Sequence, residues 1–576
     1  MIVVLLLALL TATVAAAAEP PAWPLDLDTR YLTGNFMEPR DGRFHTGLDL
    51  KTNSRTGYPV IAARDGYVAR ARCSVNGYGK AVYLVGDDGL TYVYAHLDRF
   101  ADDLRSRVRA EQTRQGRYEV DLHFGPDRFP VRRGQVLALS GQTATLGPHL
   151  HFEVRGPDGL PRDPLAHGFA VTDTLAPEIL AVRLIDPSGE AGRSLVMGDG
   201  RAPLQGELPL VAAPHGAVRF SARIVERSDH LRYRLGAWRV RLQCDGWTVL
   251  DARNDELDWR LNRQQRLEFL ETPLGRERWL WQDPRVALAD RARTGEIHLG
   301  PGDHRYTLTV EDRAGNRSQV SWTLRIADGA GDPGWSGWPN AEAPLPVPWL
   351  VAAREEGAWP AAGDAPAVTW RRGPLHQAPP PPWWRTTGLE PVGDPVQFRA
   401  GGGVLVEAVM TAWPDSAAVA AADGSVAVYR LDDDAWTWET ALDGGAFLLD
   451  RPGVHALLRD QAPPVIATAV VDTVLTDGGP AARHGVTLPR WPVLKVPVGD
   501  HGSGVDWPAV TVRVDGRPVV AEPDAPRDRL LIELPDATRP GRHRLEVVAP
   551  DRAGHRTAAA IGLHLRGRGG DADDDS

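Results

Sequence analysis

A short segment, Gly147 to Val154, alternates polar and apolar residues in a pattern that could build a reactive site. In a β-strand, residues i, i+2 and i+4 face the same side, so His149, His151 and Glu153 would share one face. Two imidazoles on one face are placed to share a metal ion or a reacting group. The residues alone also allow an ordinary strand that carries two histidines. The segments upstream are therefore needed to distinguish a reactive site from such a strand.

An imidazole and a carboxylate lie close together further upstream. His45 and Asp49 are four residues apart, a spacing that would also bring them together on a helix. Gly42 and Gly47 bracket the pair, and residues 39–42 have the composition of a turn. We therefore predict a loop that leads into a strand.

A third segment, Thr91–Leu97, alternates again, which would place Tyr92, Tyr94 and His96 on one face of a strand. A single histidine is usually a satisfied surface or core residue. Three histidine-bearing segments within about a hundred residues, each in strand or loop context, indicate a common site instead.

Together these segments resemble the lysostaphin/LytM-type (duplicated hybrid motif) zinc metallopeptidases, which are largely β-sheet enzymes that cut peptide bonds in bacterial peptidoglycan. The resemblance covers roughly residues 30 to 170, and its motifs are specific in combination. It rests on these segments, in chain order: His45-x-x-x-Asp49, Gly57–Val68, Asn76–Val82, Tyr94–Leu97, Val131–Ala138, Ser140–Thr143 and His149-Leu150-His151.

The resemblance implies a complete catalytic site. It makes His45, Asp49 and His151 the zinc ligands, and His149 and His96 the two unligated catalytic histidines. Zinc (Zn2+) is the implied cofactor, and it typically keeps three protein ligands and an open position for a water of lowered pKa. One catalytic histidine would accept the water proton and the other would hydrogen-bond the developing oxyanion. The sequence leaves these two roles interchangeable.

Two further residues near the site have an ordinary and a functional interpretation. Glu153 is either a partner that fixes a histidine tautomer or an ordinary strand carboxylate. His123 lies in an insertion at about residues 98–130, and we assign it a structural or surface role rather than that of an extra ligand. Because the insertion directly follows the His96 strand, we expect it to form a wall of the cleft.

The N-terminal residues 2–18 are apolar apart from two threonines and end in four alanines, of which Ala16-Ala17-Ala18 resemble a cleavage site. This pattern predicts a secretory signal peptide with cleavage near Ala18, although no Lys or Arg precedes the apolar run. An uncleaved anchor is the alternative. From this signal we expect an exported protein of the periplasm, the cell envelope or the exterior. No later segment is long enough to span a membrane.

Composition narrows the function classes. A chain of 576 residues with 43% hydrophobic residues can form about three to five globular domains. Its net charge of −10 provides no basic surface for nucleic acid. The two cysteines, Cys73 and Cys244, lie in different regions and are not expected to pair. The sequence does not indicate an oligomeric state.

An internal repeat organises the remainder of the chain. Residues 301–317 and 540–556 match with their spacing kept, and each copy is typical of a turn, a strand, a tight turn and a final strand. His304 and His543 occupy equivalent places, so we interpret them as scaffold residues. The expected fold class is mainly β, with an antiparallel N-terminal sheet domain followed by immunoglobulin-like β-sandwich modules. The expected division is a signal peptide at 1–18, a LytM-type zinc peptidase domain at 24–172, an immunoglobulin-like sandwich at 173–328, a Pro/Trp-rich linker at 329–393, a small β-module at 394–460, a second immunoglobulin-like sandwich at 461–567 and a disordered acidic tail at 568–576.

Three functions compete. The first is an exported zinc metalloendopeptidase that hydrolyses peptidoglycan cross-links or stem peptides. The second is a non-enzymatic or latent regulator that uses the same fold to act on another cell-wall hydrolase. A partner protein that activates this chain is compatible with both functions. The third is a structural or adhesive protein. The complete five-residue set favours the first, because the other two need no full metal site. The sequence does not indicate which peptide bond is cut.

Overall fold

The computed structural model describes the chain between residues 19 and 565 with internal gaps. The predicted signal peptide and the predicted acidic tail lie outside the described residues. These are 19–40, 42–185, 194–213, 219–229, 233–272, 274–281, 288, 291–292, 299–327, strands between 340 and 449, 453–467, 470–471, 493–535 and 537–565. No helix in these ranges is both long and apolar enough to cross a membrane.

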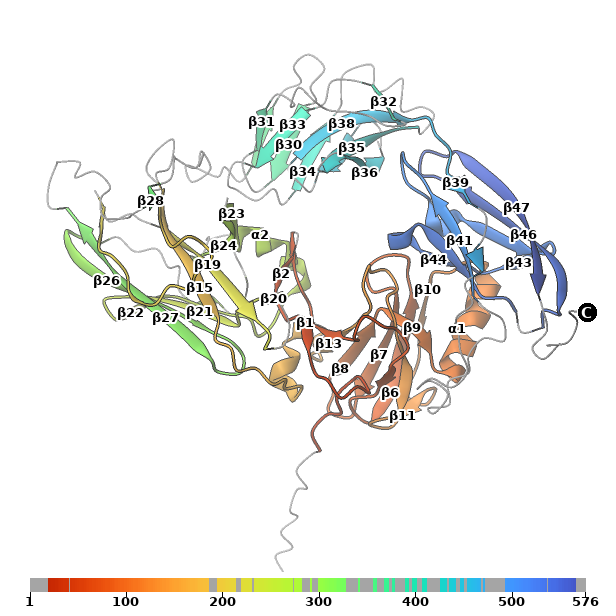
Figure 1. Cartoon of the computed structure of the whole chain (residues 1–576), viewed down its shortest axis with the longest axis horizontal. Helices are drawn as coiled ribbons and strands as arrows, with labels where there is room; N and C mark the ends of the chain where they lie inside the picture. Colours follow the sequence, from red (N-terminus) through yellow and green to blue (C-terminus); the bar gives the residue numbers. More distant parts are fainter. Residues whose placement is uncertain are drawn as a thin grey trace, which may run out of the picture.

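The N-terminal domain is built on a nine-stranded antiparallel sheet in the order β1-β4-β13-β8-β7-β6-β10 (Figure 1), with β11 beside β6 and β14 beside β13. This sheet confirms the predicted mainly β, antiparallel N-terminal domain. The strands are β1 (Leu32–Gly34), β4 (Leu48–Lys51), β6 (Gly66–Cys73), β7 (Lys80–Gly86), β8 (Thr91–Ala95), β10 (Val120–His123), β11 (Pro130–Val131), β13 (His149–Arg155) and β14 (Pro161–Arg162).

A second sheet covers one face of the first and encloses the core. It consists of β5 (Pro59–Ile61), β12 (Val136–Ser140) and β9 (Leu97–Phe100), in that order. As predicted from the alternation of β13, Leu150, Phe152 and Val154 are fully buried and pack in the core with Leu97 and Phe100 of the second sheet. The opposite face of β13 is thereby left to carry polar side chains. A small hairpin of β2 (Pro39–Arg40) and β3 (Arg43–Phe44) and a 3-10 helix, η1 (Pro164–His167), complete the domain.

The insertion after β9 does not form a wall of the cleft that holds the histidines, so this prediction is wrong. It forms helix α1 (Asp102–Gln115) and then β10, which lies at the end of the sheet, with β8, β7 and β6 between it and β13. Arg105 and Arg109 of α1 form ion pairs with Glu533 of the C-terminal module. The insertion therefore supports the C-terminal module. His123 on β10 has a side chain that is 71% exposed, as expected for a surface residue.

The first β-module consists of two packed sheets with a shared apolar core that includes Val182, Phe220, Leu308 and Trp322. One sheet contains β15 (Glu178–Ile185), β16 (Ser194–Met197), β19 (Arg219–Arg227), β20 (Arg234–Leu235), β23 (Phe269–Thr272), β24 (Gly275–Trp279) and β28 (Asn340–Ala341). The other contains β17 (Gly206–Glu207), β18 (Val211–Ala213), β21 (Arg239–Cys244), β22 (Trp247–Arg253), β25 (Arg291–Ala292), β26 (Gly302–Glu311) and β27 (Arg317–Ile326). Two short helices, η2 (Trp259–Gln264) and α2 (Gln265–Glu268), lead into β23.

The middle module takes strands from the segment that the sequence predicted as a linker. Strands within residues 356–391 pair with strands of 396–460, so this part of segment 329–393 belongs to the module and not to a linker. The strands are β29 (Glu356–Trp359), β30 (Ala367–Arg371), β31 (Leu375–Ala378), β32 (Leu389–Pro391), β33 (Val396–Ala400), β34 (Glu407–Thr411), β35 (Val426–Asp432), β36 (Ala435–Ala441), β37 (Ala446–Leu449) and β38 (Gly453–Asp460).

The C-terminal module again has two sheets, ordered β39-β41-β45-β44 with β40 beside β41, and β43-β42-β46-β47. That both repeat-bearing modules are two-sheet sandwiches agrees with the predicted architecture, while their immunoglobulin-like classification and the domain boundaries stay predictions. The elements are β39 (Val465–Ile466), β40 (Val470–Val471), β41 (Leu494–Gly499), η4 (Trp507–Ala509), β42 (Thr511–Val514), β43 (Arg517–Val519), β44 (Glu522–Asp524), η5 (Ala525–Arg527), β45 (Arg529–Ile532), β46 (Gly541–Pro550) and β47 (Arg556–Leu565).

The two copies of the repeat share their side-chain contacts as well as their sequence. Nδ1 of His304 lies 2.8 Å from Asp245, and Nδ1 of His543 lies 2.7 Å from Asp515, each on the preceding hairpin. In both copies Nε2 bonds to a backbone carbonyl four residues upstream. These contacts support the interpretation of both histidines as scaffold residues. Cys73 and Cys244 are buried and free, as expected.

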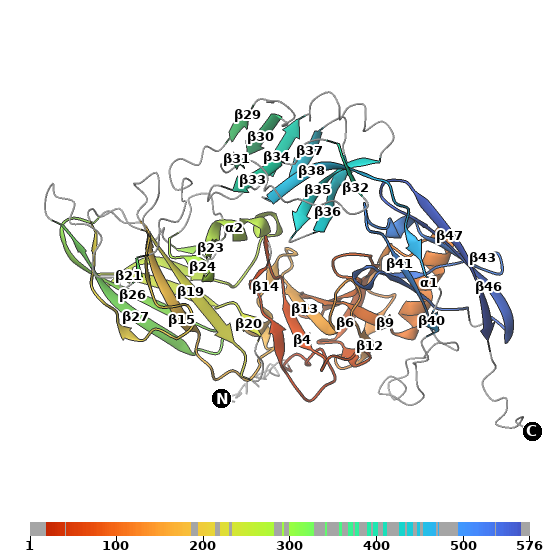
Figure 2. The same cartoon turned by 45° about the horizontal axis from the view of Figure 1, so that its top comes forward.

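The N-terminal domain lies between two modules. In Figures 1 and 2 the first module flanks it on one side and the C-terminal module on the other, and the middle module lies across from it. On the first side, Asn35 exchanges hydrogen bonds with the backbone of Gly236. On the other side, the buried apolar residues of the N-terminal domain and the C-terminal module form one continuous cluster. Both flanking modules therefore contact the domain directly.

Candidate metal centre

Two of the predicted ligands face each other across neighbouring strands. Strands β4 and β13 pair with Asp49 opposite His151, and β8 pairs on the other side with Ala95 opposite His151. These side chains point away from the apolar core, because the adjacent Leu150 and Phe152 alternate onto the core face. Asp49 and His151 are each only 4% exposed, so the site is shielded from bulk water.

The third predicted ligand, His45, lies in the loop between β3 and β4, as the glycine pattern predicted. Its N–H donates to the carbonyl of Glu38 (3.0 Å), and its carbonyl accepts from the N–H of Met37 (2.8 Å). The loop crosses β13 at Gly47, where an added Cβ would collide with the backbone carbonyl of Phe152. Glycine permits this close approach, which brings His45 beside β13.

The three side chains converge on one point, and we refer to His45, Asp49 and His151 as the ligand triangle. Nε2 of His45 lies 2.9 Å from Nδ1 of His151 and 3.1 Å from Oδ1 of Asp49, and the latter two atoms are 2.9 Å apart. Ligands about 2.0–2.2 Å from a tetrahedral ion lie about 3.3–3.5 Å apart, so a small outward movement would admit a metal ion. The structure thus brings together the three residues that the resemblance selects.

Hydrogen bonds outside the triangle orient both imidazoles. Nδ1 of His45 donates to the backbone carbonyl of Asn35 (2.8 Å), and Nε2 of His151 donates to Oε1 of Glu153 (2.9 Å). Because a carbonyl and a carboxylate only accept, the outer ring nitrogens carry the protons and the inner ones face the metal position. Outer partners of this kind are typical of histidines that bind metals. Glu153 therefore occupies the tautomer-fixing position that the sequence left open.

Glu153 is itself held by several donors. It is fully buried and accepts hydrogen bonds from Oγ1 of Thr46 (2.6 Å), the hydroxyl of Tyr78 (2.5 Å) and Nε of Arg155 (2.7 Å). Burial opposes its charge, but Arg155 and the hydrogen bonds from His151 and Thr46 outweigh burial and lower the pKa of Glu153 to about 2. Glu153 is thus a charged acceptor that fixes the ring of His151.

The two imidazoles of the triangle differ in their protonation. Burial lowers the pKa of His45 to about 4, so its ring is neutral at neutral pH. Burial acts in the same direction on His151, but its hydrogen bonds to Asp49 and Glu153 outweigh burial and raise its pKa to about 9. The metal-free triangle therefore holds one extra proton between His151 and Asp49. A bound cation would replace that proton.

The two histidines predicted to be unligated lie beside the triangle. The ring of His96 is 4.7 Å from that of His149 and 5.8 Å from that of His151, between ring centroids. Nδ1 of His96 donates to the carbonyl of Thr143 (2.8 Å), and Nδ1 of His149 donates to the carbonyl of Gly147 (2.9 Å). Nε2 of each ring therefore carries a lone pair that can accept a proton.

The predicted strand face of His96 is wrong. Tyr92 and Tyr94 lie in β8 and are buried in the apolar core, whereas His96 falls between β8 and β9. His96 has a φ of 58°, in the left-handed region, which breaks the alternation and turns its ring toward His149. Burial, and then the neighbouring His149 and His151, lower the pKa of His96 to about 3, so its ring is neutral.

Sequence reasoning missed side chains that support the ligands. The guanidinium of Arg40 pairs with Oδ2 of Asp49 and, at 3.3 Å, with Glu38. It engages the second carboxylate oxygen, so Oδ1 alone faces the histidines. The sequence could have pointed to Tyr78, because this residue lies in a glycine turn on which the family resemblance rests. Arg40 and Asn35 had no such signal, because only the folded backbone brings them to the site.

A comparison with protein families matches residues 43–114 to "Peptidase family M23". The chain contains a peptidase M23 domain. The matched segment includes His45 and Asp49 of the ligand triangle and also His96. In the structure, the sheet of the M23 domain continues beyond the match through β13, which supplies His149 and His151.

Three curated relatives share part of this chain. An "Uncharacterized metalloprotease" of Haemophilus influenzae is 34% identical over 122 residues, which are 21% of this chain and 20% of that protein. "DD-carboxypeptidase/endopeptidase Mpg" of Neisseria meningitidis serogroup B is 32% identical over 125 residues, 22% of this chain and 23% of that protein. "Murein hydrolase activator NlpD" of Salmonella dublin is 27% identical over 141 residues, which are 24% of this chain and 30% of that protein. The chain thus spans about a fifth of the length of the first two relatives.

Solved structures match over the same share of the chain. A zinc containing peptidase from Vibrio cholerae is 27% identical and covers 26% of this chain and 39% of that chain, at a TM-score of 0.19. The catalytic domain of the prophage-encoded M23 protein EnpA from Enterococcus faecalis is 25% identical and covers 26% of this chain and 96% of that chain, at a TM-score of 0.18.

Proposed function

We propose that this protein is an exported zinc metalloendopeptidase whose M23 domain hydrolyses peptide bonds in peptidoglycan cross-links or stem peptides. The observation that carries the proposal is the complete set of five side chains. Three ligating atoms lie within 3.1 Å of one another, and two further imidazoles flank them. A regulator or an adhesive module needs no such set.

The donor set fits zinc. His45, Asp49 and His151 offer two imidazole nitrogens and one carboxylate oxygen, a set that catalytic zinc accepts while it keeps one position open. The hydrogen bonds from the outer nitrogens leave the inner nitrogens facing the metal position. When bound, zinc would lower the pKa of a water molecule and polarise the scissile carbonyl.

His149 and His96 supply proton transfer in this proposal. Both rings are held through Nδ1 by backbone carbonyls, so their lone pairs on Nε2 have a fixed direction. A neutral imidazole at this place accepts a proton from the nucleophile and returns it to the leaving amine. A protonated ring also stabilises the developing oxyanion by a hydrogen bond.

Substrate class and export have separate support. The names of two relatives, a DD-carboxypeptidase/endopeptidase and a murein hydrolase activator, support peptidoglycan as the partner of this chain. Export to the periplasm, the cell envelope or the exterior is supported by the apolar segment 2–18 with its terminal alanines.

The decisive experiment is digestion of purified peptidoglycan by the full chain, with products identified by mass. We expect new peptide ends that a zinc chelator abolishes and that added zinc restores. His151→Ala should be inactive, whereas the matched control His123→Ala, on the far strand β10, should retain full activity. Digestion that persists in His151→Ala after metal removal would refute the proposal.

The second candidate function is a regulator that activates another cell-wall hydrolase. The likeness to "Murein hydrolase activator NlpD", 27% over 141 residues, favours it. Its signature differs from that of an enzyme. The chain alone would release no peptidoglycan fragments, whereas a partner hydrolase would release more fragments in its presence. His151→Ala would stimulate the partner as well as the wild type does.

A further inference from the structure

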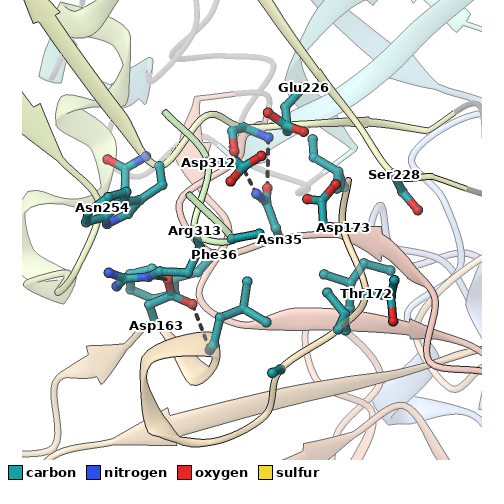
Figure 3. A pocket seen from close by; sticks show the side chains of 18 of the residues that line it. Asn35, Phe36, Asp163, Thr172, Asp173, Glu226, Ser228, Asn254, Asp312 and Arg313 are labelled. Atoms are coloured by element: carbon teal, nitrogen blue, oxygen red, sulfur yellow. Dashed lines mark hydrogen bonds and ion pairs between the residues drawn. The ribbon is translucent and has the colours of Figure 1, made fainter. Parts of the chain in front are cut away.

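A pocket of about 100 Å³ lies where the M23 domain meets the first β-module (Figure 3). Asn35 and Phe36 of the M23 domain form part of its wall, and the connecting segment 170–173 forms another part. Arg30, Leu32, Asp163 and Leu165 of the M23 domain also line the pocket, and the rest of the wall belongs to the first module. Three carboxylates line this pocket, and we call them the carboxylate corner: Asp173, Glu226 and Asp312.

The carboxylate corner has the dimensions of a cation site. One oxygen from each of the three side chains lies within 4.8 Å of the other two. Two oxygens on opposite sides of a calcium ion, each at about 2.4 Å, are about 4.8 Å apart, so the three oxygens are as close to one another as ligands of one ion are. Figure 3 shows the three side chains gathered at one end of the pocket. They come from the connecting segment, the end of β19 and the residue after β26.

Glu226 provides an independent sign of a missing partner. Its side chain is 2% exposed, and Oε1 accepts the N–H of Arg227 at 3.1 Å. Oε2 is buried, and none of the described residues donates a hydrogen bond to it. A buried carboxylate oxygen without a partner is costly, and folded proteins rarely contain one. A cation in the corner would provide the missing interaction.

The neighbouring guanidinium groups do not provide that interaction. Arg313, adjacent to Asp312 in the chain, pairs with Asp163 at 2.7 Å. Arg227, adjacent to Glu226, pairs with Glu178 at 2.9 Å. Both arginines are therefore engaged with other carboxylates, and neither forms an ion pair within the carboxylate corner.

We propose that Asp173, Glu226 and Asp312 bind a calcium ion at the junction of the M23 domain and the first module. A set of oxygen ligands alone favours calcium over zinc, and magnesium would require nearly ideal octahedral geometry and retain several waters. Asp312 is already oriented by the N–H (2.9 Å) and Nδ2 (2.8 Å) of Asn316. The ion ties the connecting segment to the module through Asp173, and so fixes the module against the M23 domain.

The repeat in the C-terminal module offers an internal comparison. There Asp551 and His555 take the places of Asp312 and Asn316. The nearby Asp460 accepts hydrogen bonds from the N–H groups of Ser503 (2.6 Å) and Ala462 (3.1 Å). Backbone donors thus satisfy Asp460, which lies beside the repeat and not in it, and we confine the proposal to the first module.

Calcium titration of the full, zinc-loaded chain after treatment with a calcium-selective chelator tests the proposal. The wild type should bind calcium with a Kd of about 0.1–1 mM, typical of extracellular modules. Its thermal midpoint should rise by about 5 °C at saturating calcium. Glu226→Gln should lose one equivalent of calcium and this shift, with zinc content unchanged. The matched control Glu207→Gln removes the same charge from an exposed position of the first module and should bind calcium normally.

Two outcomes would overturn the proposal. One is a wild type that binds no calcium at concentrations up to about 10 mM, well above the expected Kd. The other is a Glu226→Gln variant that binds as much calcium as the wild type. Asp173→Asn, on the partly exposed connecting segment, is the second variant and should also lose this equivalent. Magnesium binding of equal strength at the same residues would overturn the assignment to calcium.

Discussion

The two candidate metal sites of this chain are prepared in different ways. In the ligand triangle, both imidazoles already have hydrogen-bond acceptors on their outer nitrogens, so their inner nitrogens are oriented without a metal. In the carboxylate corner, an oxygen of Glu226 has no donor among the described residues. The triangle is therefore preorganised, whereas the corner depends on its ion.

This difference explains what each site can do. A reactive centre needs fixed ligands of mixed type and one open position, because the metal must change partners during turnover. A structural cation site needs charge and oxygen atoms from separate chain segments, because its task is to hold them together. The triangle takes its ligands from one sheet and an adjoining loop, whereas the corner combines the connecting segment with two strands of the first module.

The largest expected effect separates the two sites by metal. His151→Ala and Asp49→Ala should lose zinc and fall in turnover by at least about a thousandfold, because the metal supplies both nucleophile and electrophile. Glu226→Gln should keep its zinc. Elemental analysis of the purified variants measures this, with thermal unfolding to show that the fold is retained. Loss of zinc in Glu226→Gln would show that the sites are coupled.

The next effect separates metal binding from catalysis at the triangle. His149→Ala should stay zinc-loaded but lose about a hundred- to ten-thousand-fold in turnover, the usual loss for one proton-transfer or oxyanion group. For His96 the useful variant is His96→Asn, because asparagine tolerates the left-handed backbone found there. Zinc content and peptide turnover should therefore diverge. If His149→Ala loses zinc while His151→Ala keeps it, the two residues have been assigned backwards.

A smaller effect is expected at the other junction of the M23 domain. Arg527 of the C-terminal module donates to Oε1 of Gln142 (2.7 Å) and to the carbonyl of Thr145 (3.2 Å). The same loop supplies the carbonyls that orient His96 and His149. Arg527→Ala should therefore reduce turnover by about tenfold at unchanged zinc content, because the histidines lose their fixed position.

The matched control for Arg527 is Arg513→Ala in the same module, whose guanidinium donates a hydrogen bond to the carbonyl of Gly516. Turnover should be unaffected in this variant. Equal turnover of the two variants would mean that the C-terminal module does not position the histidine-bearing loop.

The smallest effect concerns pH. Burial, and then Asp173 and Asp312, raise the pKa of Glu226 from 4.5 to about 9 in the metal-free protein. The contribution of Glu226 to stability is therefore full below about pH 4.5 and is lost as pH rises toward about 9, because only the folded state retains the proton. Thermal unfolding in chelator should show this decline in the wild type, and Glu226→Gln should flatten it. Parallel curves for both proteins would contradict the shift.

The sequence predicted the ligand triangle better than the carboxylate corner, because most residues of the triangle lie in short sequence motifs. His45 and Asp49 lie in one short motif and His149 and His151 in another, and strand alternation assigns their faces. The carboxylate corner joins residues 173, 226 and 312, whose proximity only the folded module shows. No spacing rule connects acids that are separated by whole strands.

Two of the three predictions that failed did so for related reasons. His96 was assigned to the face of Tyr92 and Tyr94, but a single left-handed residue interrupts the alternation, and a histidine gives little warning of it. The Pro/Trp-rich segment 329–393 was predicted as a linker from composition, yet strands within residues 356–391 pair with the following module. Pairing between strands distant in sequence overrides local propensity.

The contacts between the M23 domain and the C-terminal module join residues that are far apart in the chain. Arg527 and Thr145 are 382 positions apart, and the ion pair of Lys80 and Glu522 spans 442 positions. During synthesis, the M23 domain is made before these partners, which follow the two intervening modules. Closing such long loops costs entropy and slows folding. The M23 domain is therefore made before the module that completes its contacts, so the loop that orients His96 and His149 is fixed only after the C-terminal module has been synthesised.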